Sequence, residues 1–370
     1  MRGSKSGRGG RGGYTHVFKN KPFPFDTTMC PEIFVPVKDN SHHDTTLTQE
    51  VLNASIQFSP TDSERADLTA FLTDVKKTLE TVRATTDADY LPGVVLDEVH
   101  EVGSYVKDTM LRGHRTADLV VVLKSMPTVE AVASLGQKLC SELTGENGVV
   151  SAVSRDYGLL MSRKEDKVRI LISTVLANVA ALEKDLHLTS ETINANNAAI
   201  YHARCFFEFG NHKIRALVRT LKAVRSRFPD LVHIDIWALE SLAQYALITT
   251  TSGSNLSIGP AFRRVIGLLA AGIFIPGASG LTDPVDPRYR LCDNLTNEQM
   301  DKACMTAQTL LRILAQGGVN IVLGMADKTP DITKEVTYVG SVVVAPIDRA
   351  VEADEDSSPA SDDAEMTVID

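Results

Sequence analysis

The stretch Val102-Gly103-Ser104-Tyr105, with the downstream run Thr116-Ala117-Asp118-Leu119-Val120-Val121-Val122-Leu123, decides the fold of this chain. Residues 94–102 alternate roughly as a strand does, and residues 119–123 form a continuous apolar run of strand length. The Gly-Ser pair therefore follows one strand and precedes another. Glycine lets a backbone approach a ligand closely, and the N–H groups of such a turn bind anions. The pattern predicts an α/β unit with a glycine-containing turn between two strands.

Residues 103–121 resemble, without a gap, the corresponding loop and strand of oligoadenylate synthetases, which are polymerase-β-type nucleotidyltransferases. Those enzymes place a D-x-D pair on the second strand, because two metal ions need several carboxylate oxygens to activate a hydroxyl and stabilise the leaving pyrophosphate. Here Thr116 stands at the first carboxylate position, and only Asp118 is retained. The third carboxylate aligns with Leu171. The resemblance thus implies that the chain has no catalytic residues and no metal site.

Residues 217–222 resemble the synthetase helix whose arginine and lysine grip the triphosphate, here Arg219 and Lys222. The resemblance predicts a degenerate nucleotide-binding pocket, with no cofactor required but a nucleoside triphosphate as a candidate bound ligand. Its residues are Gly103, Ser104, Asp118, Arg219 and Lys222. The alternative is an ordinary amphipathic helix, with an apolar core stripe on one side and a solvated basic face on the other.

Length and charge predict the domain organisation. A chain of 370 residues, 43% of them apolar, is long enough for two packed lobes. We expect an α+β/α architecture: a disordered Gly/Arg-rich tail (1–30), a nucleotidyltransferase-like α/β lobe (31–185), a helical lobe with the dimerisation surface (186–347) and an acidic disordered tail (348–370). Within the first lobe, residues 14–59 are rich in proline and polar residues and are expected to be extended. No apolar run is long enough to cross a membrane.

Two capping boxes mark helix starts, at Thr61-Asp62-Ser63-Glu64 and at Thr296-Asn297-Glu298-Gln299. Residues 260–275 are apolar on most of the helix circumference, which favours a central helix over an interface helix. The second capped helix, residues 296–316, supplies the interface candidates. These are Met300, Met305, Leu310, Leu311 and Leu314.

The whole chain resembles the family named "domain associated with zinc fingers" (DZF). The resemblance rests on residues 103–123, the basic helix, the segment Ala261-Phe262-Arg263-Arg264 through Phe274-Ile275-Pro276-Gly277, and Gly280-Leu281-Thr282-Asp283-Pro284. It implies a nuclear protein that forms a heterodimer with a larger family member carrying double-stranded-RNA-binding domains or zinc fingers, and that acts in transcription regulation and RNA processing. RNA or DNA would then be bound through the complex, and no membrane would be involved.

Two other functions stay open at this level. A weak template-free nucleotidyltransferase would recruit Asp108 or Glu101 as substitute metal ligands. A direct RNA or DNA binder would use the Arg-Gly tail, Arg8-Gly9-Gly10-Arg11, together with the basic helix. The net charge of -9 argues against binding a duplex by bulk electrostatics, because neutralisation of phosphates dominates such affinity.

Overall fold

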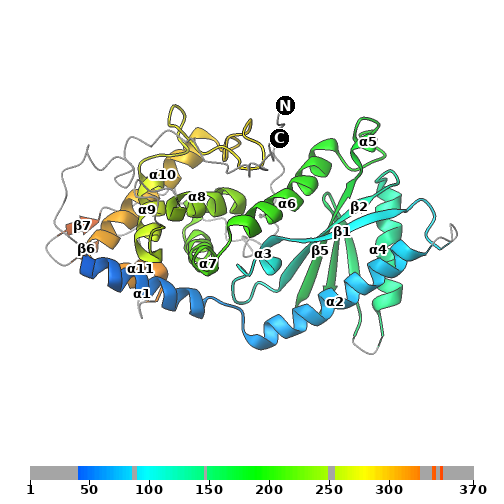
Figure 1. Cartoon of the computed structure of the whole chain (residues 1–370), viewed down its shortest axis with the longest axis horizontal. Helices are drawn as coiled ribbons and strands as arrows, with labels where there is room; N and C mark the ends of the chain where they lie inside the picture. Colours follow the sequence, from blue (N-terminus) through cyan, green and yellow to red (C-terminus); the bar gives the residue numbers. More distant parts are fainter. Residues whose placement is uncertain are drawn as a thin grey trace, which may run out of the picture.

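The computed structural model describes residues 41–85, 90–145, 148–248 and 255–325, together with two short strands, β6 (Val336–Tyr338) and β7 (Val342–Val344). The chain forms two lobes, an α/β lobe on the right of Figure 1 and a helical lobe on the left. The expected architecture of an α/β lobe packed on a helical lobe is therefore confirmed. The two tails expected to be disordered lie outside the described residues. Among the described helices, none is long and apolar enough to span a membrane.

The α/β lobe is built on a five-stranded sheet in the order β1-β2-β5-β4-β3. The strands are β1 (Leu96–Val102), β2 (Thr116–Leu123), β3 (Ser151–Arg155), β4 (Gly158–Arg163) and β5 (Asp166–Thr174). The central pair β2 and β5 is parallel, and the other pairs are antiparallel. A parallel pair needs a crossover connection, which here includes α4 (Val129–Leu143) and the β3–β4 hairpin.

The two faces of the sheet are covered by different helices. On one face, α2 (Asp62–Ala84) and α4 pack together over side chains such as Leu119 and Ile170. On the other face, α6 (Ser190–Phe209) packs over Val120 and Leu171. Because side chains alternate along a strand, Thr116 and Asp118 lie on the α6 side together with Val120. The sequence predicts the boundary between the two lobes at residues 185/186. Helix α6 lies after this boundary in sequence, but it packs on the sheet of the α/β lobe.

The helices of the helical lobe are α1 (Ser41–Gln57), α7 (His212–Arg227), α8 (Ile236–Ile248), α9 (Ile258–Ala270), α10 (Asn297–Ala315) and α11 (Val319–Leu323), with a 3-10 turn at Pro229–Leu231. Helix α9 lies among the others and packs against α1, α7, α8 and α10. Phe262 and Val265 of α9 are fully buried, so the expected central position of this helix is confirmed. Between α9 and α10 the chain forms an irregular segment, which lies above α8 in Figure 1.

The expectation of an extended chain over residues 14–59 is wrong where the structure describes it, because Ser41–Gln57 forms α1. The apolar residues Leu47, Val51 and Ala54 follow one side of this helix and enter the core of the helical lobe. Leu52 is only partly buried, Ile56 is exposed and the other residues of α1 are polar, so the apolar stripe is narrow. Packing against α7 and α9 supplies the stabilisation that the local sequence signals only weakly.

Both predicted capping boxes are confirmed. Thr61 caps α2 and accepts a hydrogen bond from the backbone N–H of Glu64, whose carboxylate accepts from the N–H of Thr61 at 2.7 Å. The second Glu64 oxygen accepts from the N–H of Gly113 at 3.0 Å, which ties the start of α2 to the loop before β2. Thr296 caps α10 in the same reciprocal way.

We expect Thr61→Ala to lower the free energy of unfolding by about 1 kcal/mol, because the first turn of α2 loses a side-chain acceptor. Thr73→Ala is the matched control, since Thr73 is also exposed on α2 but bonds only to the carbonyl of Thr69. It should change stability by less than about 0.5 kcal/mol. Urea unfolding followed by circular dichroism measures both, and equal losses would contradict the role of the cap.

Candidate functional site

The turn after β1 is shaped by Gly103, which has a φ of +73° and begins the one-turn helix α3 (Gly103–Val106). A Cβ atom at this position would lie 1.9 Å from the Oδ2 atom of Asp118. Glycine is therefore required twice, for its left-handed backbone and for the space that the Asp118 carboxylate fills. The structure thus brings the predicted residues Gly103 and Asp118 into direct contact.

The carboxylate of Asp118 is bonded to an arginine of the neighbouring strand. Arg169 on β5 pairs in register with Asp118 on β2, and its Nε donates to Asp118 Oδ1 at 2.6 Å. The two side chains are 7% and 5% exposed, so the ion pair is buried. Sequence reasoning missed Arg169, although a lone charge between Val168 and Ile170 in an apolar strand signals that a buried partner is needed.

The position aligned with the third metal carboxylate is apolar. Leu171 is 2% exposed and belongs to a small apolar cluster with Val102, Val120 and two residues of α6, Ile200 and Ala203. In the described part of the chain, no three His, Cys, Asp or Glu side chains gather in a way that could hold a metal ion. On this face of the sheet, the carboxylate of Asp118 thus has a guanidinium and aliphatic groups as neighbours.

The two carboxylates considered as substitute ligands are engaged by cations. Glu101 on β1 forms an ion pair with Lys76 of α2. Asp108, in the loop after α3, forms ion pairs with Arg65 of α2 at 2.7 Å and with Arg219 of α7 at 3.3 Å. Neither carboxylate is paired with Asp118 in a shared site.

Helix α7 brings the predicted cations onto the turn. Lys222 Nζ donates to Ser104 Oγ at 2.6 Å, and Arg219 donates to the backbone carbonyl of Asp108 at 2.6 Å and to Ser55 Oγ at 3.2 Å. Lys222 therefore contacts the start of the loop after β1, at Ser104, whereas Arg219 contacts the end of the same loop, at Asp108. Burial lowers the pKa of the Arg219 guanidinium, and the Asp108 carboxylate opposes that shift.

The alternative of a solvated basic face on α7 is wrong for its central cations. Arg219 and Lys222 are 8% and 7% exposed, because this side of the helix packs on the α/β lobe. Two cations at the end of the helix are also used internally. Arg225 donates to the carbonyls of Ile234 and Val232, and Arg227 donates to the carbonyl of Val322 at 2.6 Å. Most of the cationic side chains of α7 are thus bonded to other groups of the same chain.

A second buried ion pair joins the two lobes. Lys107 of the loop donates to Glu240 Oε2 of α8 at 2.7 Å, with side chains 8% and 2% exposed. The ammonium also lies 5.4 Å from the centre of the Phe206 ring and 5.5 Å from that of Trp237. Sequence reasoning missed this pair, because its members are far apart in the chain. It fixes the loop against the helical lobe at a point next to the Ser104–Lys222 contact.

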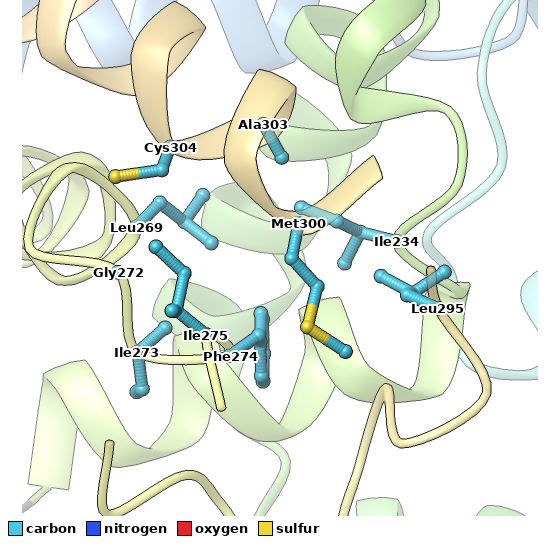
Figure 2. Close-up of a pocket in the computed structure, with 10 residues that line it drawn as sticks. All are labelled: Ile234, Leu269, Gly272, Ile273, Phe274, Ile275, Leu295, Met300, Ala303 and Cys304. Carbon is cyan, nitrogen blue, oxygen red and sulfur yellow. The ribbon is translucent and has the colours of Figure 1, made fainter. Parts of the chain in front are cut away.

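The interface candidates on α10 divide by burial. Met300, Leu310 and Leu314 are buried in the core of the chain itself, Leu311 is partly buried, and Met305 is 44% exposed. Figure 2 shows Met300 beside Ile234 and Leu295, at a cavity of about 10 Å³ that Ile273 also lines. That volume is close to the minimum for one water molecule. Their role in dimerisation stays a prediction, for which only Met305 offers an exposed side chain.

Two family models and several solved structures match this chain. Residues 15–211 match the model of the DZF N-terminal domain, and residues 213–345 match that of the DZF C-terminal domain. Among solved structures, CdnC of E. coli MS115-1 in a complex with HORMA-deltaN gives a TM-score of 0.52 at 14% identity, covering 77% of this chain and 97% of that chain. A cytoplasmic RNA terminal U-transferase gives 0.52 at 11% identity, covering 77% of this chain and 100% of that chain.

The Cid1 poly(U) polymerase gives a TM-score of 0.51 at 11% identity, covering 73% of this chain and 94% of that chain. Identities this low show a common fold and nothing more specific. The nucleotidyltransferase-like fold expected from the sequence is thereby confirmed.

Asp118→Asn keeps the shape of the side chain but removes the negative charge bonded to the buried Arg169 guanidinium. We expect the free energy of unfolding to fall by about 3–5 kcal/mol. Adding Arg169→Met also removes the buried positive charge, so the double variant should lose less stability than the two single variants together, with a coupling of about 1–3 kcal/mol. Chemical denaturation of the four proteins of this cycle measures the coupling.

Asp97→Asn on β1 is the control for this cycle. Asp97 pairs at 3.1 Å with Lys124, the residue after β2, but the two side chains are 30% and 60% exposed. An exposed pair contributes less than about 1 kcal/mol. If Asp118→Asn cost no more than Asp97→Asn, the Asp118–Arg169 pair would not have the structural role assigned to it.

Proposed function

The chain belongs to the DZF family, and from this premise we propose that it is a catalytically inactive nucleotidyltransferase-like scaffold. We further propose that, within the family, it is similar to interleukin enhancer-binding factor 2, also called nuclear factor 45. The scaffold would form a heterodimer with a larger relative that carries double-stranded-RNA-binding domains or zinc fingers. The complex would act in the nucleus, in transcription regulation and RNA processing.

The observation that carries the proposal is that the Asp118 carboxylate is bonded to Arg169. Two-metal phosphoryl transfer needs several carboxylates converging on both ions. Here the single retained carboxylate is held at 2.6 Å by Arg169, and the aligned third position is Leu171 in an apolar cluster. A guanidinium bonded to the carboxylate repels a divalent cation, and aliphatic groups offer it no ligands. The fold is retained while the chemistry it could support is lost.

The geometry argues against the weak enzyme. Asp108 and Glu101 would have to leave their ion pairs with Arg65 and Lys76 before either could turn toward a metal at Asp118. They also lie at different places, one in the loop after α3 and the other on β1. Recruiting them would break existing contacts without completing a three-carboxylate site.

The geometry also supports binding of RNA through a partner. A direct binder would need an exposed basic surface, but Arg219 and Lys222 of α7 are buried against the α/β lobe. The Arg-Gly tail is outside the described residues, and the chain as a whole carries a net charge of -9. A larger relative with its own RNA-binding domains would supply what this surface lacks.

We expect the purified chain to incorporate no labelled nucleotide into RNA or short oligonucleotides with Mg²⁺ or Mn²⁺, above the level of Asp118→Ala. The reason is that phosphoryl transfer without the paired metal ions loses most of its electrostatic stabilisation. Gel analysis of the products, with an active terminal uridylyltransferase as a positive control, measures incorporation. Sustained turnover that Asp118→Ala abolishes would refute the scaffold proposal.

The dimerisation surface can be tested with two equally exposed apolar residues. Met305 on α10 is 44% exposed and Val153 on β3 is 46% exposed. We expect Met305→Arg to reduce the amount of the larger relative that co-purifies from nuclear extract, because a charge is then buried in the interface. Val153→Arg should leave co-purification unchanged. Equal effects of the two variants would place the interface elsewhere.

A further inference from the structure

The five-stranded sheet has two edges, and the edge formed by β1 is well protected. Helices α2 and α6 both pack on β1, and its register with β2 shifts between Leu96 and Glu98. The guanidinium of Arg83 on α2 donates to the backbone carbonyl of Asp97 at 3.4 Å. Covering helices, an irregular register and charged side chains are the means by which sheet edges avoid pairing with other strands.

The edge formed by β3 is open by comparison. Its five residues pair with β4 without a shift in register, and in the described part of the chain its backbone bonds to β4 only. All of its side chains except that of Ala152 are exposed, and Val153 at its centre is 46% exposed. Val149, two residues before the strand, is 78% exposed. A regular backbone edge beside exposed valines is a template for an added strand.

The side chains on β3 indicate what kind of strand this edge accepts. Val153 lies opposite Leu160 of β4, which lies opposite Arg169 of β5, so Val153 faces the side of the sheet on which α6 packs over β1, β2 and β5. Arg155, two residues further on, faces the same side. It is exposed and has no acidic partner among the residues that the structure describes. A matching strand therefore has an apolar residue opposite Val153 and a carboxylate opposite Arg155.

The acidic tail, residues 348–370, contains one segment with this pattern. Near its end, Thr367-Val368-Ile369 is a run of three β-branched residues, the residue types that favour strands. Asp370 lies two residues after Val368, as Arg155 lies two residues after Val153. An acidic segment that only keeps a chain soluble does not require such a run, because charge and polarity suffice for that role.

From this match we propose that residues 366–370 of the acidic tail pair in parallel with β3 and extend the sheet by one strand. In this register Val368 lies opposite Val153, and the Asp370 carboxylate lies opposite the Arg155 guanidinium. Main-chain hydrogen bonds supply the affinity of such an added strand, and the alternate side chains supply its selectivity. The partner of the β3 edge is thus a segment of the same chain.

The connection between the two segments is long enough. Residues 345–366 follow β7, and when extended they span up to about 70 Å. A compact chain of this length has a radius of gyration of roughly 20 Å. Because the pairing is intramolecular, contacts too weak to hold two separate molecules together suffice to hold the tail.

The bound tail also has a consequence for the edge itself. It covers the exposed backbone groups of β3, which are otherwise available to a strand of a second molecule. The proposal is independent of the scaffold role, since neither catalysis nor a larger relative is needed for the tail to bind.

An engineered disulfide in the full chain tests the pairing. We expect Val153→Cys with Val368→Cys to form its disulfide under a mild oxidant about tenfold faster than Val95→Cys with Val368→Cys, because pairing raises the local concentration of one thiol near the other. Val95 is the matched control, since it is 53% exposed and lies directly before β1, at the opposite edge of the sheet. Peptide mapping by mass spectrometry identifies each disulfide. Equal rates for the two pairs would overturn the proposal.

Hydrogen exchange of the β3 amides measures the same pairing without cysteines. Val368→Asp should make the amides of residues 151–155 exchange about tenfold faster than in the natural chain, because the edge is then uncovered. Val351→Asp, elsewhere in the acidic tail, should change nothing.

Charge reversal tests the register. Arg155→Asp should remove the protection of β3, and adding Asp370→Arg should restore it, because the two charges attract again with their signs exchanged. The proposal is overturned if β3 exchanges equally in the natural chain and in Val368→Asp. It is also overturned if the protection in the natural chain rises with protein concentration, since a second copy would then be the occupant of the edge.

Discussion

The ion pair between Asp118 and Arg169 connects the two central strands of the sheet at the edge where the lobes meet. Asp118 also packs against the backbone of Gly103, so the position of its carboxylate fixes the start of the loop that follows β1. That loop then makes the contacts between lobes, through Ser104 with Lys222 and through Lys107 with Glu240. Removing two charges from water is costly, and their attraction offsets that cost only when both partners are present. The ion pair is therefore a constraint on the whole junction between the lobes.

Local sequence signals predicted the elements that local interactions decide. The capping boxes at Thr61 and Thr296, the apolar run of β2 and the central helix α9 could all be found from spacing and residue type. What the sequence could not show is which charges meet. Arg169 reaches Asp118 only through the parallel register of β2 and β5, and Glu240 reaches its partner only when α8 packs across the junction. Helix α1 was missed for a related reason, since its narrow apolar stripe is stabilised by packing rather than by its own sequence.

The basic residues of α7 illustrate how the same constraint affects function. In sequence they resemble a phosphate-gripping helix, and in the structure Arg219 and Lys222 hold the loop of the other lobe. Positive charge that stabilises the junction is not displayed to nucleic acid at the surface. We therefore propose that this member of the DZF family acts as a scaffold and that its partner binds RNA through domains of its own.

The central claim is that Asp118 serves the structure and not a metal ion. Titration of the purified chain with Mn²⁺, followed by the electron paramagnetic resonance signal of the free ion, tests it most directly. The acidic residues 348–370 would bind some Mn²⁺ in any variant, so the informative quantity is the difference between the natural chain and Asp118→Ala. We predict that the two bind the same amount of Mn²⁺, with and without nucleoside triphosphate. A site that is present in the natural chain and lost in Asp118→Ala would contradict the claim.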